Sequence, residues 1–218
     1  MILFGSTLSP FVRKTVAFAT EKGLDFELKP RGIGDPDPDF CKASPFRKMP
    51  ALQDGDYCLA DSSAICHYIE AKHPDPALIP AEARARGQVV WFDEFADTIL
   101  FGCGQKVFFN RVVAPRFLNR PGDESVAEAA LRDELPPILD YLESVVPTEG
   151  GFLVGDRISL ADMPYPVPSQ TSAIWESKST QANIHARGAT SSRSSTAPAS
   201  SLSWPRKLRS WSEQPRKL

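Results

Sequence analysis

The residues of this sequence best suited to chemistry are Ser9 and Pro10, which stand just behind a short apolar segment at the N-terminus. A serine before a proline is typical of a helix start, because serine caps free N–H groups and proline fits the first helical position. The Ser9 hydroxyl would then lie at the positive end of the helix dipole, a place that binds anions or stabilises a thiolate. Ser6 lies in the same loop and is a rival for this role. Taken alone, Ser9 is better explained as a simple cap.

Composition argues against several function classes. The 218 residues carry a formal net charge of −2, so nothing global indicates a nucleic-acid or membrane partner. No C-x-x-C and no metal-ligand spacing occurs, so we expect no metal site. Isolated cysteines are typical of a reducing compartment, and we find no signal-peptide pattern or bilayer-spanning apolar run, so we expect a cytoplasmic protein. The cysteines are interpreted as core or incidental residues: Cys41, Cys58, Cys66 and Cys103.

Charge is divided unevenly along the chain. Residues 164–218 hold eight Lys or Arg, two Glu and 13 serines, whereas residues 1–163 are acidic. This last segment has few apolar residues and no sustained helical or strand period, so we predict a disordered, low-complexity basic tail. A nucleic-acid or partner-binding arm is the weaker interpretation, because the tail interrupts a helix at its cap.

Residues 1–75 predict a small α/β domain. Four short apolar segments predict strands, at 1–4, 25–28, 51–52 and 57–59. Two amphipathic segments predict helices, at 11–22 and 62–72, and residues 30–46 predict a loop or irregular helix. The order β-α-β, loop, β-β-α indicates a thioredoxin-like fold.

The remaining sequence is helical in pattern. After a proline-bearing linker, 76–82, helices are predicted at 83–109 and 125–146, the second bent at Pro136-Pro137. Ser159 and Asp162 then form a capping-box pattern that signals another helix. Three prolines follow at once, beginning with Pro164, so we expect an incomplete all-helical domain over 83–163.

Four segments together resemble the cytosolic glutathione S-transferase family, in its serine-type, bacterial-like form. They are SPFVRK at 9–14, SPFRKMPAL at 44–52, DSSAI at 61–65 and GDRISLAD at 155–162. The resemblance covers residues 1–163 and stops at Met163. It implies a transferase that uses glutathione as substrate and, where the fold is intact, assembles as a homodimer.

The resemblance also implies how glutathione is held. Met49 would pair its backbone with the cysteinyl part, and Pro50 would follow a cis peptide bond. Asp61 and Ser62 would receive the γ-glutamyl end, because a carboxylate suits its ammonium and a helix start suits its carboxylate. Lys48 would pair with the glycyl carboxylate.

Ser9 is the residue that the resemblance makes catalytic. Its hydroxyl would donate to the glutathione sulfur and lower a thiol pKa that is ordinarily about 8.5. The thiolate would then attack an electrophilic carbon, with no covalent enzyme intermediate and no metal. Ser9 is preferred over Ser6 because it immediately precedes the proline.

The electrophilic substrate is not encoded in any motif. Phe11 is assigned to the glutathione site, and four aromatics are candidates for the acceptor pocket: Phe11, Phe101, Phe108 and Phe109. A second hypothesis is a non-catalytic binding or stress protein that uses the same fold.

The departure after Met163 suggests a reading-frame shift. Back-translated one base upstream with permitted codons, the tail gives an apolar helix directly after the capping box. The hypothesis is that residues 164–218 are a frameshift product of a glutathione transferase gene. Loss of a buried helix removes several apolar side chains worth about 1.5–3 kcal/mol each, so we expect poor stability and little activity from the chain as written.

Overall fold

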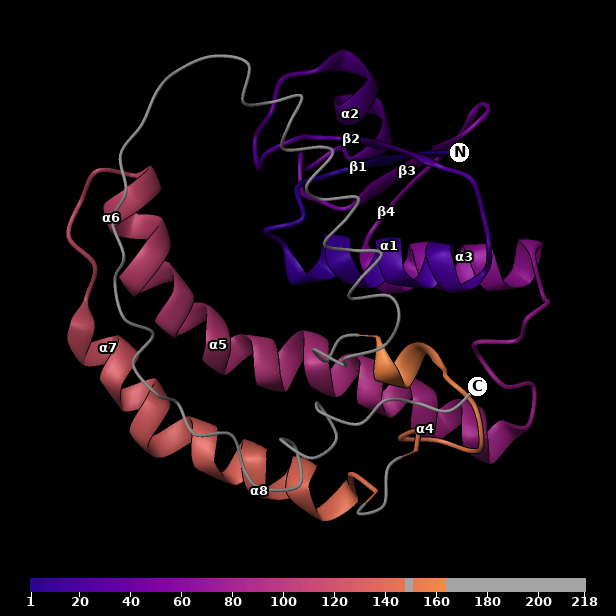
Figure 1. Cartoon of the computed structure of the whole chain (residues 1–218). Helices are drawn as coiled ribbons and strands as arrows, with labels where there is room; N and C mark the ends of the chain where they lie inside the picture. Colours follow the sequence, from indigo (N-terminus) through magenta and orange to yellow (C-terminus); the bar gives the residue numbers. More distant parts are fainter. Residues whose placement is uncertain (148–150, 164–218) are drawn as a thin grey trace, which may run out of the picture.

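The computed structural model describes residues 1–147 and 151–163, which Figure 1 draws in colour. In this part a mixed sheet with three helices comes first, and a helical region follows from residue 83. The predicted tail at 164–218, and the expectation that no helix follows the capping box, lie outside the described residues.

Four short strands form one sheet in the order β2-β1-β3-β4. β1 (Ile2–Phe4) is parallel to β2 (Glu27–Lys29) and antiparallel to β3 (Ala51–Asp54), which is antiparallel to β4 (Tyr57–Ala60). The strand predicted at 25–28 was wrong by one to two residues. Its position is set by pairing with β1, in which Ile2 lies opposite Glu27.

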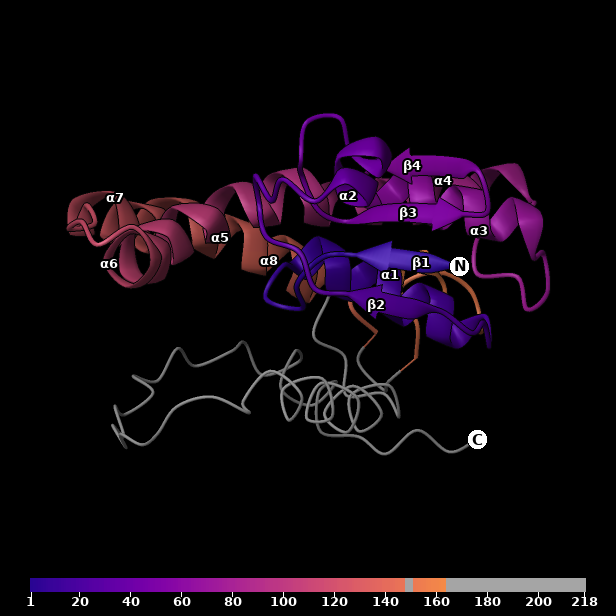
Figure 2. The same cartoon turned by 90° about the horizontal axis from the view of Figure 1, so that it is seen from above.

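Helices cover both faces of this sheet. α1 (Pro10–Glu21) and α3 (Ser62–Lys72) pack side by side on one face, and α2 (Pro38–Ala43) lies on the other (Figures 1 and 2). The alternation of a strand explains this, because Leu3 packs with α1 and α3 while Phe4 packs against Phe40. The thioredoxin-like prediction is confirmed.

α1 forms for the reasons read from its sequence. Ser9 is its N-cap and Pro10 its first residue. The helix ends before Gly23, whose φ of +67° favours glycine and whose N–H donates to the Thr20 carbonyl at 2.9 Å. As the N-cap, Ser9 is thus held at the start of α1.

The helical region consists of two long runs. The first joins α4 (Ala83–Glu94), the π-helical η1 (Phe95–Leu100), α5 (Phe101–Phe108), the π-helical η2 (Phe109–Val113) and α6 (Ala114–Phe117). The predicted end near residue 109 was wrong. No glycine or proline interrupts 105–114, and the chain first leaves the helix near Asn119, whose φ is +48°.

The second run joins α7 (Glu124–Ala129), the π-helical η3 (Ala130–Glu134) and α8 (Leu135–Val145). Pro136 and Pro137 lie in the first turn of α8, directly after η3. Because proline has no N–H, the pair interrupts the regular ladder at this point. The structure has a π-helical turn, η3, just before the prolines at which the sequence predicts a bend.

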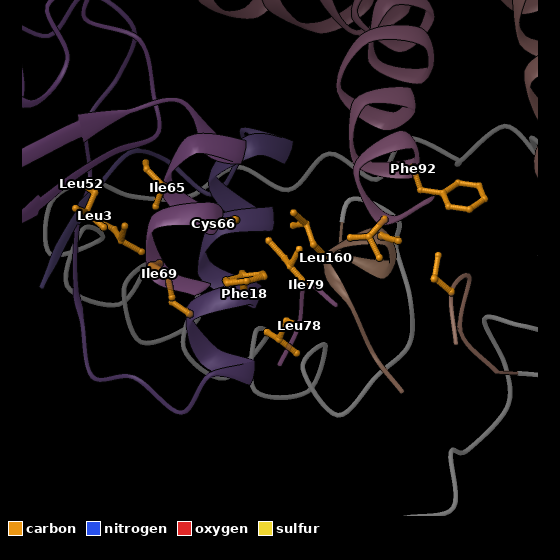
Figure 3. Close-up of a cluster of buried hydrophobic side chains, with 14 residues drawn as sticks. Leu3, Phe18, Leu52, Ile65, Cys66, Ile69, Leu78, Ile79, Phe92 and Leu160 are labelled. Atoms are coloured by element: carbon orange, nitrogen blue, oxygen red, sulfur yellow. The ribbon is translucent and has the colours of Figure 1, made fainter. Parts of the chain in front are cut away.

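One buried cluster joins the sheet unit to the helical region. Figure 3 shows Leu3, Phe18 and Ile65 of the sheet unit in the same cluster as Phe92 of α4 and Leu160 of η4 (Leu160–Asp162). Asp162 accepts from the Ser159 N–H at 2.9 Å, which holds the start of η4. No described helix combines the length and apolar character that a bilayer-spanning segment needs.

A buried ion pair holds the segment between α3 and α4. The Lys22 Nζ lies 2.5 Å from a Glu70 oxygen and donates to the carbonyls of His73 at 2.8 Å and Pro76 at 2.6 Å. Glu70 in turn accepts from the Leu78 N–H at 3.2 Å. These contacts satisfy both charges and fix the path of the chain into the helical region.

Candidate functional site

A pocket of about 300 Å³ lies where α1 and α3 begin and where the chain passes from α2 into β3. Its lining combines segments far apart in sequence: Phe11, Ser44, Phe46, Lys48, Met49, Pro50, Ala60, Asp61 and Ser62. Every predicted binding residue lines it except Ser9. The structure therefore brings together residues that the sequence marks in three separate motifs.

Gly5 shapes the loop that leads to Ser9. Its φ is +151°, and a Cβ at this position would lie 2.5 Å from a Val12 methyl carbon and 3.2 Å from the Met49 Cβ. Both the positive φ and the short contact with Val12 therefore exclude a side chain at position 5. This close approach lets the neighbouring Ser6 N–H point to the Met49 sulfur at 3.3 Å.

Ser9 stands half-buried at the N-terminus of α1. Its backbone is extended, and its hydroxyl oxygen accepts from the Val12 N–H at 3.5 Å, a long and weak hydrogen bond. The hydroxyl hydrogen is not used by this contact. The rival Ser6 oxygen accepts from the Leu8 N–H at 3.4 Å, within its own loop.

Arg13 supports the loop between the two serines. Its guanidinium donates to the carbonyls of Thr7 at 3.0 Å and Leu8 at 3.2 Å. Burial lowers its pKa, but an arginine remains charged at neutral pH. The loop is thus tied to α1, one helical turn beyond Ser9.

The segment before β3 is held by a reciprocal pair of hydrogen bonds. The buried Ser44 hydroxyl donates to the Lys48 carbonyl at 2.8 Å and accepts from the Lys48 N–H at 3.0 Å. The Met49–Pro50 peptide bond is cis, as the resemblance implies. Lys48 itself is exposed, so its ammonium lies at the rim of the pocket.

Asp61 and Ser62 lie at the start of α3. Asp61 caps the helix by accepting from the Ala64 N–H at 3.0 Å, and its φ of +82° is unusual for a residue other than glycine. Backbone strain of this kind costs about 1–3 kcal/mol and is concentrated at functional sites. Asp61 is exposed, whereas Ser62 is only 2% exposed.

The four aromatic candidates lie in three different places. Phe11 lines the pocket and meets Phe101 of α5 edge to face, with ring centroids 4.5 Å apart. Phe108 instead lines a second cavity of about 330 Å³ between α5 and the second helical run, together with Cys103 and Leu131. Phe109 is 39% exposed and lines neither pocket.

Sequence reasoning missed a buried charged cluster below the start of α3. The Lys14 ammonium lies 2.7 Å from an Asp93 oxygen and also contacts the Asp97 carboxylate. Burial favours the neutral form of Lys14, but the two carboxylates outweigh it and the Lys14 pKa is raised. Burial likewise raises the Asp97 pKa, against the opposing effect of Lys14. The available signal was two aspartates four residues apart on an otherwise apolar helix face.

A metal centre is not evident in this part of the chain. Within residues 1–147 and 151–163, no three histidines, cysteines or carboxylates gather as metal ligands would.

Cys66 lies close to Lys14 and the two aspartates, and burial raises the pKa of its thiol. Cys66 therefore stays protonated and unreactive at neutral pH.

Comparisons with known proteins point in one direction. Two family models match, described as glutathione S-transferase N-terminal domain over residues 3–77 and glutathione S-transferase C-terminal domain over residues 109–165. A rice protein (Oryza sativa subsp. japonica) named probable glutathione S-transferase GSTF2 is 33% identical over 167 residues, 75% of this chain and 76% of its own.

Solved structures agree with these matches. The apo form of human glutathione S-transferase T1-1 superposes with a TM-score of 0.65 and 31% identity, over 75% of this chain and 70% of that one. Human glutathione transferase theta-2, in complex with glutathione and an unknown ligand, gives a TM-score of 0.66 at 25% identity, over 75% and 68%.

Proposed function

Because the chain belongs to the glutathione S-transferase family, we propose that its pocket binds glutathione and conjugates the thiolate to a small hydrophobic electrophile. The observation that carries the proposal is the pocket lining, which unites Lys48, Met49, Pro50, Asp61 and Ser62. These residues come from two segments that no local sequence pattern places together. Their charges and hydrogen-bonding groups suit the two ends of an extended, doubly acidic tripeptide.

The ends of glutathione are assigned by charge. Asp61 receives the ammonium of the γ-glutamyl end, and the N–H and hydroxyl of Ser62 at the start of α3 receive its carboxylate. Lys48 at the rim pairs with the glycyl carboxylate. The backbone of Met49, turned outward by the cis bond to Pro50, pairs with the cysteinyl part.

Ser9 is assigned the role of stabilising the glutathione thiolate. Its hydroxyl hydrogen is not used by the contact with Val12, so it is available to the glutathione sulfur. Together with the N-terminus of α1, this donor favours the anion and lowers the thiol pKa. The thiol proton passes to solvent. The thiolate then attacks the electrophilic carbon, and the C–S bond forms as the leaving group departs with its electron pair.

Phe11 and Phe101 are proposed to border the electrophile. Phe11 lies in the pocket and Phe101 packs on it from α5, which makes an apolar wall beside the sulfur position. This supports a hydrophobic acceptor.

The chain is further proposed to be a cytoplasmic homodimer of the serine-type, bacterial-like group. Phe46 is 86% exposed at the pocket rim, which supports an apolar contact with a second copy. Light scattering of the purified chain tests the dimer.

We also propose that residues 164–218 arise from a frameshift. The C-terminal family-model match ends at residue 165, next to the departure after Met163. Sequencing the coding DNA around codon 163 decides the matter. Codons that give no apolar helix in the alternative frame would remove the hypothesis, and a cooperative melt of residues 1–218 with normal turnover would contradict the expected instability.

A non-catalytic binding protein of the same fold is the alternative. The absence of Ser9 from the pocket lining favours that alternative. Capture on immobilised glutathione followed by a Ser9→Ala activity assay separates the two. Capture combined with serine-dependent turnover supports the transferase, whereas capture without any turnover supports the binding protein.

A further inference from the structure

The far end of the first helical run combines arginines with exposed apolar side chains. Residues 98–122 hold four Lys or Arg and no Asp or Glu, although residues 1–163 as a whole are acidic. Every residue from 115 to 121 is exposed, and Phe117 and Leu118 are 61% and 49% exposed. We call residues 115–121 the tip. The overall charge of −2 gives no indication of this local basic and apolar surface.

The two arginines of the tip have no carboxylate partners. Among the residues that the structure describes, Arg116 and Arg120 form no ion pair. Arg120 instead lies over the Phe109 ring, with its guanidinium carbon 5.5 Å from the ring centroid. The next acids along the chain are already used, because Asp123 caps α7 and Glu124 forms an ion pair. The tip therefore offers two positive charges to an external anion.

Hydrogen bonds hold the tip in shape. The chain turns at Asn119, and the Arg120 N–H then donates to the Ala114 carbonyl at 3.1 Å. The Asn110 side-chain oxygen accepts from the Asp123 N–H at 2.9 Å, which ties the following segment back to the helix. Figures 1 and 2 show α6 at the end of the helical region that points away from the sheet. A preformed, projecting surface loses little conformational entropy on binding.

Charge and shape together select the occupant of the tip. A two-fold contact between copies would bring the arginines of both tips together, which like-charge repulsion disfavours. Residues 164–218 also carry excess positive charge, so they are no better suited. An acidic peptide needs a groove, and neither of the two cavities described above is lined by tip residues. A flat anionic surface with an apolar layer beneath it matches both the charge and the exposed apolar side chains.

We propose that the tip binds the surface of an anionic phospholipid bilayer, with Arg116 and Arg120 at the phosphates and Phe117 and Leu118 inserted among the headgroups. An arginine donates several N–H groups to phosphate oxygens, and each basic residue near such a surface strengthens binding about fivefold. Phenylalanine and leucine side chains bury well at the boundary between headgroups and acyl chains. The contact is peripheral and does not depend on the glutathione pocket.

The test is sedimentation of the full chain with phosphatidylcholine vesicles, prepared with and without phosphatidylglycerol. Two matched pairs of variants are compared. Phe117→Ser is paired with Phe46→Ser, which changes an exposed phenylalanine at the rim of the pocket. Arg116→Gln is paired with Arg84→Gln, which changes an exposed arginine at the start of α4. The members of each pair have the same composition and net charge, so they differ only in the position of the change.

The unmodified chain is expected to bind the vesicles with phosphatidylglycerol about 25-fold more tightly than neutral ones, since two arginines contribute about fivefold each. High salt is expected to weaken this preference. Phe117→Ser is expected to weaken binding about tenfold and Arg116→Gln about fivefold, whereas Phe46→Ser and Arg84→Gln bind like the unmodified chain.

Equal binding to both kinds of vesicle, or equal losses in the two members of either pair, would overturn the proposal. Light scattering without vesicles tests the other occupant. A dimer that Phe117→Ser dissociates would assign the tip to a second copy of the chain and would likewise overturn the proposal.

Discussion

Replacement of Ser9 by alanine separates its two roles, because the cap contact and the hydrogen bond to the thiolate differ in free energy. As a cap, the hydroxyl accepts from Val12 at 3.5 Å, so its loss is expected at the low end for caps, about 0.5 kcal/mol of unfolding free energy. As a donor to a thiolate, it makes a hydrogen bond to a charged group, worth about 1.5–3 kcal/mol. Ser9→Ala should therefore lower kcat/KM by roughly 10- to 150-fold while the fold persists.

The assay is the pH dependence of kcat/KM with an activated aryl halide, for the unmodified chain, Ser9→Ala and the matched control Ser6→Ala. The thiol pKa that governs the profile is expected to rise by about 1–2 units in Ser9→Ala, following from the same free energy. Ser6→Ala is expected to follow the unmodified profile, because the Ser6 oxygen is used within its own loop. A loss in Ser6→Ala with a normal Ser9→Ala would refute the assignment.

Three further outcomes are expected. Asp61→Ala should raise KM for glutathione about tenfold with a smaller change in kcat, measured by steady-state kinetics, because it removes a charge that pairs with the ligand ammonium; an unchanged KM contradicts the assignment. Lys22→Met should lower the unfolding free energy by about 3–5 kcal/mol, because it leaves the buried Glu70 carboxylate without its ammonium. The control Lys106→Met breaks a half-exposed pair with Glu134 and should lower the unfolding free energy by less than about 1 kcal/mol. Equal urea midpoints of the two variants would refute this difference. Backbone hydrogen bonds hold the pKa of Glu82 and of the cap Asp37 below their ordinary values of 4.5 and 3.8. The two carboxylates therefore stabilise the fold above those values, and this stabilisation is lost as the pH falls through their lower folded pKa values. Urea midpoints that stay constant from about pH 6 to about pH 3 would contradict this pH dependence.

Local patterns were sufficient for most of the fold. The ends of α1 are set by Ser9 and Pro10 at its start and by Gly23 after its end, because caps and prolines act within a few residues. The helix at 62–72 was predicted with the bounds of α3, since Asp61 caps it. Strand 25–28 was displaced because register depends on the partner strand, which a single segment does not reveal.

The pocket could be predicted only through the family resemblance. Nothing local indicates that Lys48 and Asp61 meet at one pocket, because contacts between distant segments depend on the sheet order. Lys14 was missed for a related reason. A lysine on an amphipathic helix is ordinarily solvated, and only the packing of α4 against α1 and α3 buries it.

The most direct test of the account is the thiol pKa of glutathione bound to the unmodified chain, followed by ultraviolet thiolate absorbance during a pH titration. Bound glutathione is expected to ionise at least one pKa unit below the ordinary value of about 8.5, because Ser9 and the N-terminus of α1 favour the anion. A bound thiol that ionises like the free one, or a chain that does not bind glutathione, would contradict it.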